Sequence, residues 1–201
     1  MDMNPTTHPH LRIGEVVLRT GRYDEMRAWY RLVLDLDPYY ENLPNLPKLP
    51  IGRNEPGTDH PAWATQVRLA FFRLSLDHPY QQVIALFDVP GTGALHPTAA
   101  GLHHMQLREQ SLQSLATDYR RLKAHGVEPF RTVDHGPSMS FYYKDPDANV
   151  VELAASNHAT IGAYLESLDS PEFKRNPSGV PVDADFVTAA IEECAGALPR
   201  P

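Results

Sequence analysis

Apolar and polar positions along the chain predict one pattern of secondary structure that occurs twice. In the first copy, residues 12–20 combine β-branched and long side chains in the manner of a strand. Residues 23–36 carry apolar side chains three and four positions apart, which is the spacing of one helical face. The residues on this face are Met26, Trp29, Tyr30, Val33 and Leu34. Pro38 is expected to end the helix, because proline cannot continue one. Two strands are expected next, at about 64–76 and 81–89.

The second copy begins after a linker rich in Gly and Pro at 90–101. A strand, a helix and three strands are expected again, at 102–108, 112–125, 129–133, 138–144 and 149–155. Gly126 follows the helix, where glycine commonly ends one in the left-handed conformation. Each copy therefore has the order strand, helix and about three strands.

We expect the chain to have three parts. A first module covers residues 8–92, a second module covers 99–158, and a tail follows at 159–201. The first module contains a Pro-rich insertion at 39–62, which is long for a connection inside a compact domain. The insertion is therefore either functional or mobile, and a lid that selects the substrate is one such function.

The tail is expected to be partly helical. The motif S-P-E-F at 170–173 is typical of a helix start, and residues 183–196 form a second helical segment with Asp183 as N-cap. The apolar face of this segment consists of Phe186, Val187, Ala190 and Ile191. We expect this helix to pack on the outside of the sheet or on a second subunit.

Composition excludes several classes of protein. A hydrophobic content of 42% with 21% charged residues is typical of a soluble globular domain. The formal charge of −7 argues against non-specific nucleic-acid binding. The sequence has no run of 18 apolar residues that could span a membrane, and its first ten residues lack the features of a secretory signal. A single Cys194 excludes an internal disulfide, so we expect a cytoplasmic protein.

Candidate chemical groups follow from the alternation of side chains between the two faces of a strand. His104 and Gln106 share one face of their strand, and Ser140 and Tyr142 share one face of theirs. Glu152 takes the corresponding face of the last strand. We therefore expect His104, Glu152 and Tyr142 to converge on the concave side of one curved sheet.

Comparison of the two copies predicts a metal site. In the first copy Glu15 and Arg19 take the corresponding face, and overlaying V-V-E-L on V-I-A-L places Ala85 opposite Glu152. The four related positions are thus Glu15, Ala85, His104 and Glu152, and three of them can bind a first-row metal ion. Alternatively, Glu15 pairs with a neighbouring arginine or marks a pocket that binds no metal.

The two-copy pattern resembles the vicinal oxygen chelate superfamily, which includes glyoxalase I, bleomycin-resistance proteins and type I extradiol dioxygenases. The stretches that carry the resemblance are G-L-H-H-M-Q-L and H-G-P-S-M-S-F-Y-Y-K-D-P-D-A-N-V-V-E-L. The tail S-P-E-F-K-R-N-P-S-G-V is similar to that of single-domain, biphenyl-diol dioxygenase-like members. The resemblance covers roughly residues 11–158. It implies an α+β fold in which two βαβββ modules form one cup-shaped mixed sheet with helices outside.

The resemblance also implies roles for individual residues. His104 and Glu152 match the second and third metal ligands, while Glu15 stands where the extradiol enzymes have a histidine. Tyr142 matches the tyrosine that hydrogen-bonds a substrate hydroxylate, and His135 matches an acid–base histidine. The turn D-P-D-A-N departs mildly from the usual D-P-D-G-N. The residues expected to bind the substrate are Tyr142, Ser140, Gln106 and Arg19.

The activity implied by the resemblance is extradiol cleavage of a catechol-like aromatic by O2, with Fe(II) as the metal and Mn(II), Zn(II) or Ni(II) as alternatives. A second interpretation keeps the metal but not the oxygen, as in an isomerase, lyase or epimerase of the glyoxalase type, although Ala85 at the fourth ligand position argues against it. A third is a metal-free protein that binds a small molecule. A homodimer is expected, with neither nucleic acid nor membrane as a partner.

Overall fold

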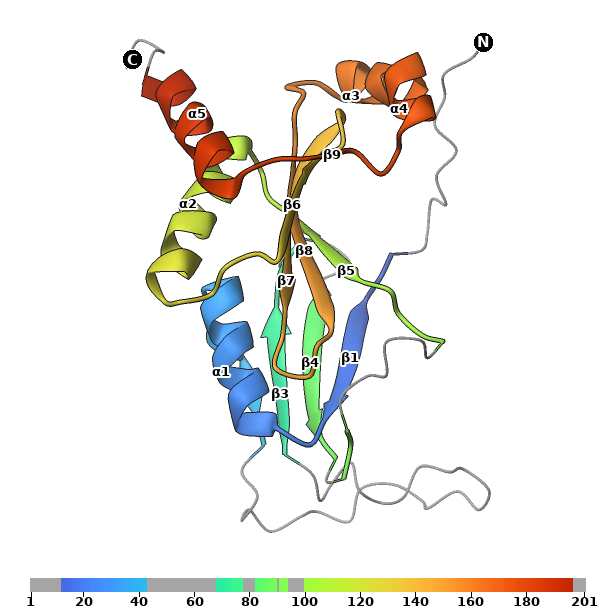
Figure 1. Cartoon of the computed structure of the whole chain (residues 1–201). Coiled ribbons are helices and arrows are strands. Elements are labelled where there is room, and N and C mark those ends of the chain that lie inside the picture. The colour runs from blue at the N-terminus through green and yellow to red at the C-terminus, as the bar shows by residue number, and fades with distance from the viewer. Residues whose placement is uncertain (1–11, 43–67, 78–81, 90, 94–99, 197–201) are drawn as a thin grey trace. The chain divides into compact units, whose positions relative to one another are not determined.

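The computed structural model describes residues 12–42, 68–77, 82–89, 91–93 and 100–196 (Figure 1). Most of the expected insertion at 39–62 and part of the expected linker at 90–101 lie outside these residues. The chain divides into two units, Met1–Gly93 and Ala94–Pro201. The tail belongs to the second unit. No helix in the described ranges is long and apolar enough to cross a membrane.

The first unit is a βαβββ module with a four-stranded mixed sheet. Its elements are β1 (Glu15–Thr20), α1 (Tyr23–Leu34), β2 (Tyr40–Glu41), β3 (Leu69–Arg73) and β4 (Val83–Asp88). The strand order is β1-β4-β3-β2, with β1 parallel to β4 and the other neighbours antiparallel. Helix α1 contacts β4 and buries its apolar face, which consists of Tyr23, Met26, Tyr30 and Val33.

Helix α1 ends earlier than the sequence predicts. Its last residue is Leu34, and Asp35 follows with a left-handed φ of 50°. Aspartate tolerates this conformation better than most residues, and it lets the amide of Leu36 reach the carbonyl of Arg31 at 3.3 Å. The backbone therefore leaves the helix three residues before Pro38, so the expectation that Pro38 ends the helix is wrong.

The second unit repeats the module and adds the tail. Its elements are β5 (Met105–Arg108), α2 (Leu112–Ala124), β6 (Arg131–Asp134), β7 (Ser138–Lys144), β8 (Val150–Ser156), α3 (Ile161–Asp169), α4 (Pro171–Arg175), β9 (Val180–Pro181) and α5 (Ala184–Gly196). The strand order is β5-β8-β7-β6-β9, with β5 parallel to β8. The predicted α+β class and paired βαβββ modules are confirmed. The described strands form two mixed sheets, one in each unit, where one cup-shaped sheet was expected.

Local signals are present at both ends of α2, and the one at its C-terminal end, Gly126, was expected from the sequence. Ser111 and Ser114 form a capping box at the start, in which each side chain bonds the other residue's backbone. Gly126 has a φ of 76° and donates its amide to the Lys123 carbonyl at 2.9 Å. The buried face of α2 consists of Leu115, Ala116, Tyr119 and Leu122 and contacts β8.

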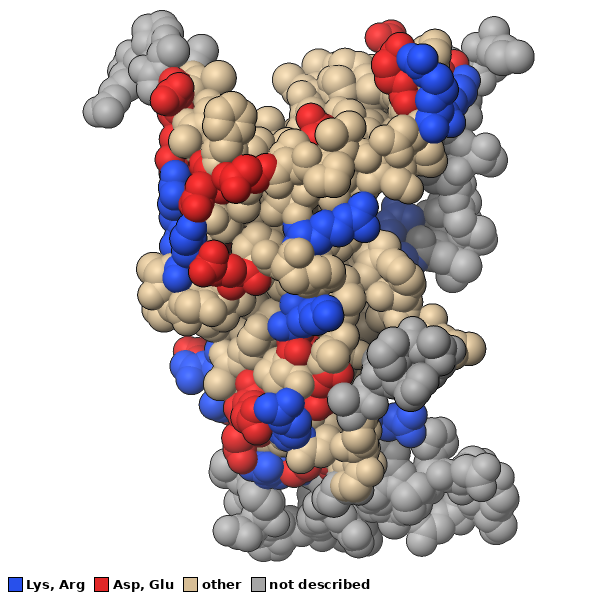
Figure 2. All heavy atoms as spheres, in the orientation of Figure 1, with Lys and Arg blue, Asp and Glu red and all other residues tan. Residues whose placement is uncertain are grey.

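Two contacts of the tail were not predicted from the sequence. Helix α5 begins as predicted, because the Asp183 side chain accepts the Phe186 amide at 2.8 Å. However, α5 lies on α2 of its own chain, where Figure 2 shows acidic and basic side chains intermixed. Strand β9 pairs with β6 and extends the sheet by one strand that the sequence did not predict.

Candidate metal and substrate site

Strand register in the second unit aligns three of the predicted site residues in one row. Parallel pairing of β5 with β8 sets Gln106 opposite Glu152, and antiparallel pairing of β7 with β8 sets Tyr142 opposite Glu152. His104 precedes Gln106 by two positions and therefore shares its face. Hydrogen bonding between strands thus collects an imidazole, an amide, a carboxylate and a phenol on one face of the sheet.

Glu152 lies at the centre of this row. The residue is only 2% exposed, and a carboxylate buried in this way is costly unless it is paired. One oxygen, Oε2, lies 2.9 Å from Nε2 of His104, and the other, Oε1, accepts the amide of Gln106 at 2.8 Å. Gln106, which we expected to bind substrate, thus uses its amide to hold Glu152.

A further histidine orients the His104 ring. The Nδ1 atom of His103 lies 2.7 Å from Nδ1 of His104. Because this contact engages Nδ1, the opposite ring nitrogen is the one that faces Glu152. Such contacts at the outer nitrogen commonly fix the orientation of histidines that bind metal ions.

The His104–Glu152 pair fits a divalent metal ion. Imidazole nitrogen and carboxylate oxygen are donors that iron, manganese, zinc and nickel all accept. Two ligand atoms that lie about 2.1 Å from one ion at right angles are about 3 Å apart, and His104 Nε2 and Glu152 Oε2 are 2.9 Å apart. Within the described residues of the second unit, no third Asp, Glu, His or Cys side chain completes a group of three metal ligands with this pair.

The first unit has the same register with different side chains. Val17, Ala85 and Phe71 are paired across β1, β4 and β3 as Gln106, Glu152 and Tyr142 are across β5, β8 and β7. Glu15 precedes Val17 by two positions and so corresponds to His104. It is exposed on β1, as is Arg19. Of these corresponding positions, only that of Glu15 has a side chain that can bind metal.

Tyr142 and His135 form a second pair beside Glu152. The Tyr142 hydroxyl lies 3.0 Å from Nε2 of His135, and its ring meets that of His104 edge-on at 6.0 Å between centroids. Burial raises the pKa of Tyr142 above its ordinary value, and the nearby Glu152 carboxylate raises it further. The Tyr142 hydroxyl is therefore a hydrogen-bond donor at neutral pH. Ser140 lies on the same face of β7, with its hydroxyl buried beside Tyr142.

The surroundings of His135 and Tyr142 include groups that the sequence did not suggest. The guanidinium of Arg131 lies 5.4 Å from the centre of the Tyr142 ring. The backbone carbonyl of Pro177, in the tail, lies 3.2 Å from Nδ1 of His135. A carbonyl is common to every residue, so no side-chain pattern could have predicted this contact.

Comparisons with known proteins identify the family of the chain. Residues 12–153 match the profile of the Glyoxalase/Bleomycin resistance protein/Dioxygenase superfamily. The chain is 31% identical over 180 residues to biphenyl-2,3-diol 1,2-dioxygenase 2 of Rhodococcus globerulus, covering 90% of this chain and 81% of that protein. It is also 31% identical over 170 residues to biphenyl-2,3-diol 1,2-dioxygenase 3 of the same organism, covering 84% and 75%.

Among solved structures, a glyoxylase/bleomycin resistance protein/dioxygenase domain from Frankia sp. EAN1pec superposes with a TM-score of 0.54 at 19% identity. The match covers 75% of this chain and 95% of that one. At this identity the likeness shows a shared fold.

Proposed function

Because this chain belongs to the glyoxalase/bleomycin resistance protein/dioxygenase superfamily, we propose that it is an extradiol-type dioxygenase that cleaves the ring of a catechol-like aromatic. Two relatives that match most of the chain carry the name biphenyl-2,3-diol 1,2-dioxygenase. The observation that carries the proposal is the adjacency of two pairs, His104 with Glu152 and His135 with Tyr142. The first pair suits a metal ion, and the second suits proton transfer beside it.

His104 and Glu152 are the proposed metal ligands, with Glu15 as the third. The proposed metal is Fe(II), and Mn(II), Zn(II) and Ni(II) suit the same donors. A bound ion would supply Lewis acidity to two adjacent substrate oxygens and, if it is iron, reactivity toward O2. Gln106 would hold the Glu152 carboxylate in place, and His103 would hold the His104 ring.

Tyr142 and His135 would handle the substrate and its proton. The Tyr142 hydroxyl would donate a hydrogen bond to one oxygen of the diol and so stabilise its negative charge. Before this negative charge forms, the diol hydroxyl would instead donate to the Tyr142 oxygen while the Tyr142 hydroxyl donates to Nε2 of His135, 3.0 Å away, and this relay would pass the proton of the diol to His135. Ser140 and Arg19 are the remaining residues that we propose to contact the substrate.

A second candidate function is an isomerase, lyase or epimerase that uses a metal but no O2. The observation that favours it is Glu15, because a ligand set of two carboxylates and one imidazole is harder than the His2Glu set of the extradiol enzymes. A third, a metal-free protein that binds a small molecule, applies if no metal ion is retained.

Oxygen consumption tests the proposed function. We expect the protein, reconstituted anaerobically with Fe(II), to consume one O2 per molecule of diol when supplied with biphenyl-2,3-diol or a simple catechol. The matched control is His104→Ala, which removes one proposed ligand and should abolish the uptake. Turnover of a diol without O2 uptake would contradict ring cleavage and support the second candidate.

A further inference from the structure

The tail runs along the edge of the second unit's sheet beside the proposed acid–base histidine. In β9, Val180 pairs with Asp134 and Pro181 pairs with Val133, and the Val182 amide then donates to the Thr132 carbonyl at 3.1 Å. This pairing carries the preceding tail residues past His135, which directly follows β6. The tail is therefore hydrogen-bonded to β6, the strand that directly precedes His135.

Two backbone carbonyls of the tail reach the residues that surround Tyr142. The Pro177 carbonyl lies 3.2 Å from Nδ1 of His135, and the Ser178 carbonyl accepts the Arg131 guanidinium at 3.3 Å. A carbonyl can only accept, so Nδ1 of His135 carries the hydrogen. In the neutral ring the lone pair is then on Nε2, the atom 3.0 Å from the Tyr142 hydroxyl. The tail contact thus selects the tautomer in which His135 can accept a proton from Tyr142.

Gly179 permits this close approach. It has a left-handed φ of +74°, and a Cβ placed there would lie 2.5 Å from the Asp134 carbonyl oxygen and 2.9 Å from Nδ1 of His135. The first of these contacts is with backbone, which cannot turn aside as a flexible side chain can. Any larger residue at this position would therefore push the tail away from His135.

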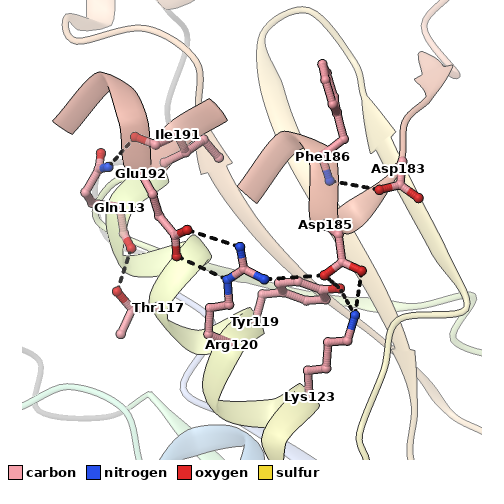
Figure 3. A network of polar contacts seen from close by, with 10 residues as sticks. All are labelled: Gln113, Thr117, Tyr119, Arg120, Lys123, Asp183, Asp185, Phe186, Ile191 and Glu192. Atoms are coloured by element: carbon pink, nitrogen blue, oxygen red, sulfur yellow. Dashed lines mark hydrogen bonds and ion pairs between the residues drawn. The ribbon is translucent and has the colours of Figure 1, made fainter. Parts of the chain in front are cut away.

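A polar network on α5 holds the far end of the tail (Figure 3). The Asp185 carboxylate accepts Lys123 Nζ at 2.5 Å and the Tyr119 hydroxyl at 2.8 Å. Arg120 contacts both oxygens of Glu192, at 3.1 and 3.2 Å. These contacts join α5 to α2, so the segment that carries Pro177 and Gly179 is followed by a docked helix.

We propose that the C-terminal tail is a positioning element of the catalytic site, in which the Pro177 carbonyl fixes the His135 tautomer and Gly179 makes the contact possible. The effect on catalysis rests on the proposed function, whereas the tautomer of His135 does not. Pro177 and Gly179 act through His135 and are positioning residues.

The test compares Gly179→Ala with Gly126→Ala in the full chain. Gly126 has nearly the same φ, +76°, but nothing within 4 Å of its Cβ position, so it controls for backbone strain alone. The tautomer of His135 is read from the 15N NMR signals of its imidazole ring. The protein is loaded with Zn2+, because this ion is diamagnetic and does not broaden the signals. The signals of His135 are those that disappear in His135→Gln. We expect hydrogen on Nδ1 in the unsubstituted chain and loss of that signature in Gly179→Ala only. The diol kcat should fall on the order of tenfold in Gly179→Ala, with KM nearly unchanged.

Hydrogen on Nε2 of His135 in the unsubstituted chain would overturn the proposal, even if Gly179→Ala did not fold. An equal change of signature in both glycine variants would overturn it as well. If the unsubstituted chain shows no dioxygenase activity but the tautomer responds to Gly179→Ala alone, the positioning contact stands and the proposed reaction fails.

Discussion

At the scale of single residues, Glu152 is the group on which the candidate site depends. It is almost completely buried. Its Oε2 atom contacts the imidazole of His104, and its Oε1 atom accepts a hydrogen bond from the amide of Gln106. Removal of either partner would leave one buried carboxylate oxygen without its hydrogen-bond donor, which is costly in a low-dielectric environment. A bound cation would compensate the negative charge of the Glu152 carboxylate, so the burial of this carboxylate favours metal binding.

Tyr142→Phe tests the hydroxyl without disturbing the packing of the ring. We expect kcat for the diol to fall by roughly 10²-fold, because one donor to a developing oxyanion is lost. Metal content should be unchanged, since the phenol is not among the proposed ligands. Steady-state kinetics and elemental analysis measure the two effects.

Tyr143→Phe is the matched control, because this neighbouring tyrosine lies on the opposite face of β7. Its hydroxyl is buried without a hydrogen-bond partner among the described residues, so its removal should preserve activity and leave stability equal or higher. Equal losses of activity in the two variants would contradict a chemical role for Tyr142.

At the scale of elements, the sequence predicted best the helices and strands in which a periodic pattern of apolar residues extends over most of the element. Helices α1 and α2 and strands β7 and β8 lie within a few residues of their expected bounds, because each buries one face or both. Strand β9 has two residues, one of them a proline, and so has no period to detect. Strand β9 forms because it pairs with β6, which lies more than 40 residues earlier in the chain, and such a distant partner leaves no signal in the local sequence.

Asp185→Asn tests the docking of α5 on α2. The bonds from Lys123 and Tyr119 hold the pKa of Asp185 below its ordinary value. Because the pKa of Asp185 is lower in the folded protein than in the unfolded chain, its contacts stabilise the fold fully at pH values above the ordinary pKa of an aspartate. This stabilisation is lost as the pH falls through the pKa of the folded state. We therefore expect faster amide hydrogen exchange in α5 of the variant at neutral pH, with a difference that shrinks in acid.

Glu193→Gln is the matched control, since it removes the same charge from an exposed position on α5. It should leave exchange in α5 unchanged. Equal exchange in Asp185→Asn and in the unsubstituted chain at neutral pH would show that the network of Figure 3 does not hold the tail.

At the scale of the whole molecule, the two modules share one topology but differ in chemistry. The sequence predicted the repeat and the convergence of His104, Glu152 and Tyr142, because alternation along a strand determines which side chains share a face. It did not predict the Pro177 contact, which is made by a backbone group. The role of Glu15 stays a prediction, as does the homodimer, which sedimentation velocity would test.

The most direct test is the amount of metal bound per chain, measured by elemental analysis after anaerobic reconstitution with Fe(II) and desalting. We expect about one ion per chain, none in Glu152→Gln, and weaker binding in Glu15→Ala. We also expect Gln106→Ala to lower the affinity about 10–100-fold, the usual cost of losing a partner that orients a ligand. The exposed Gln110→Ala should match the unsubstituted chain. No retained metal with Fe(II), Mn(II), Zn(II) or Ni(II) would contradict the proposed metal-dependent chemistry.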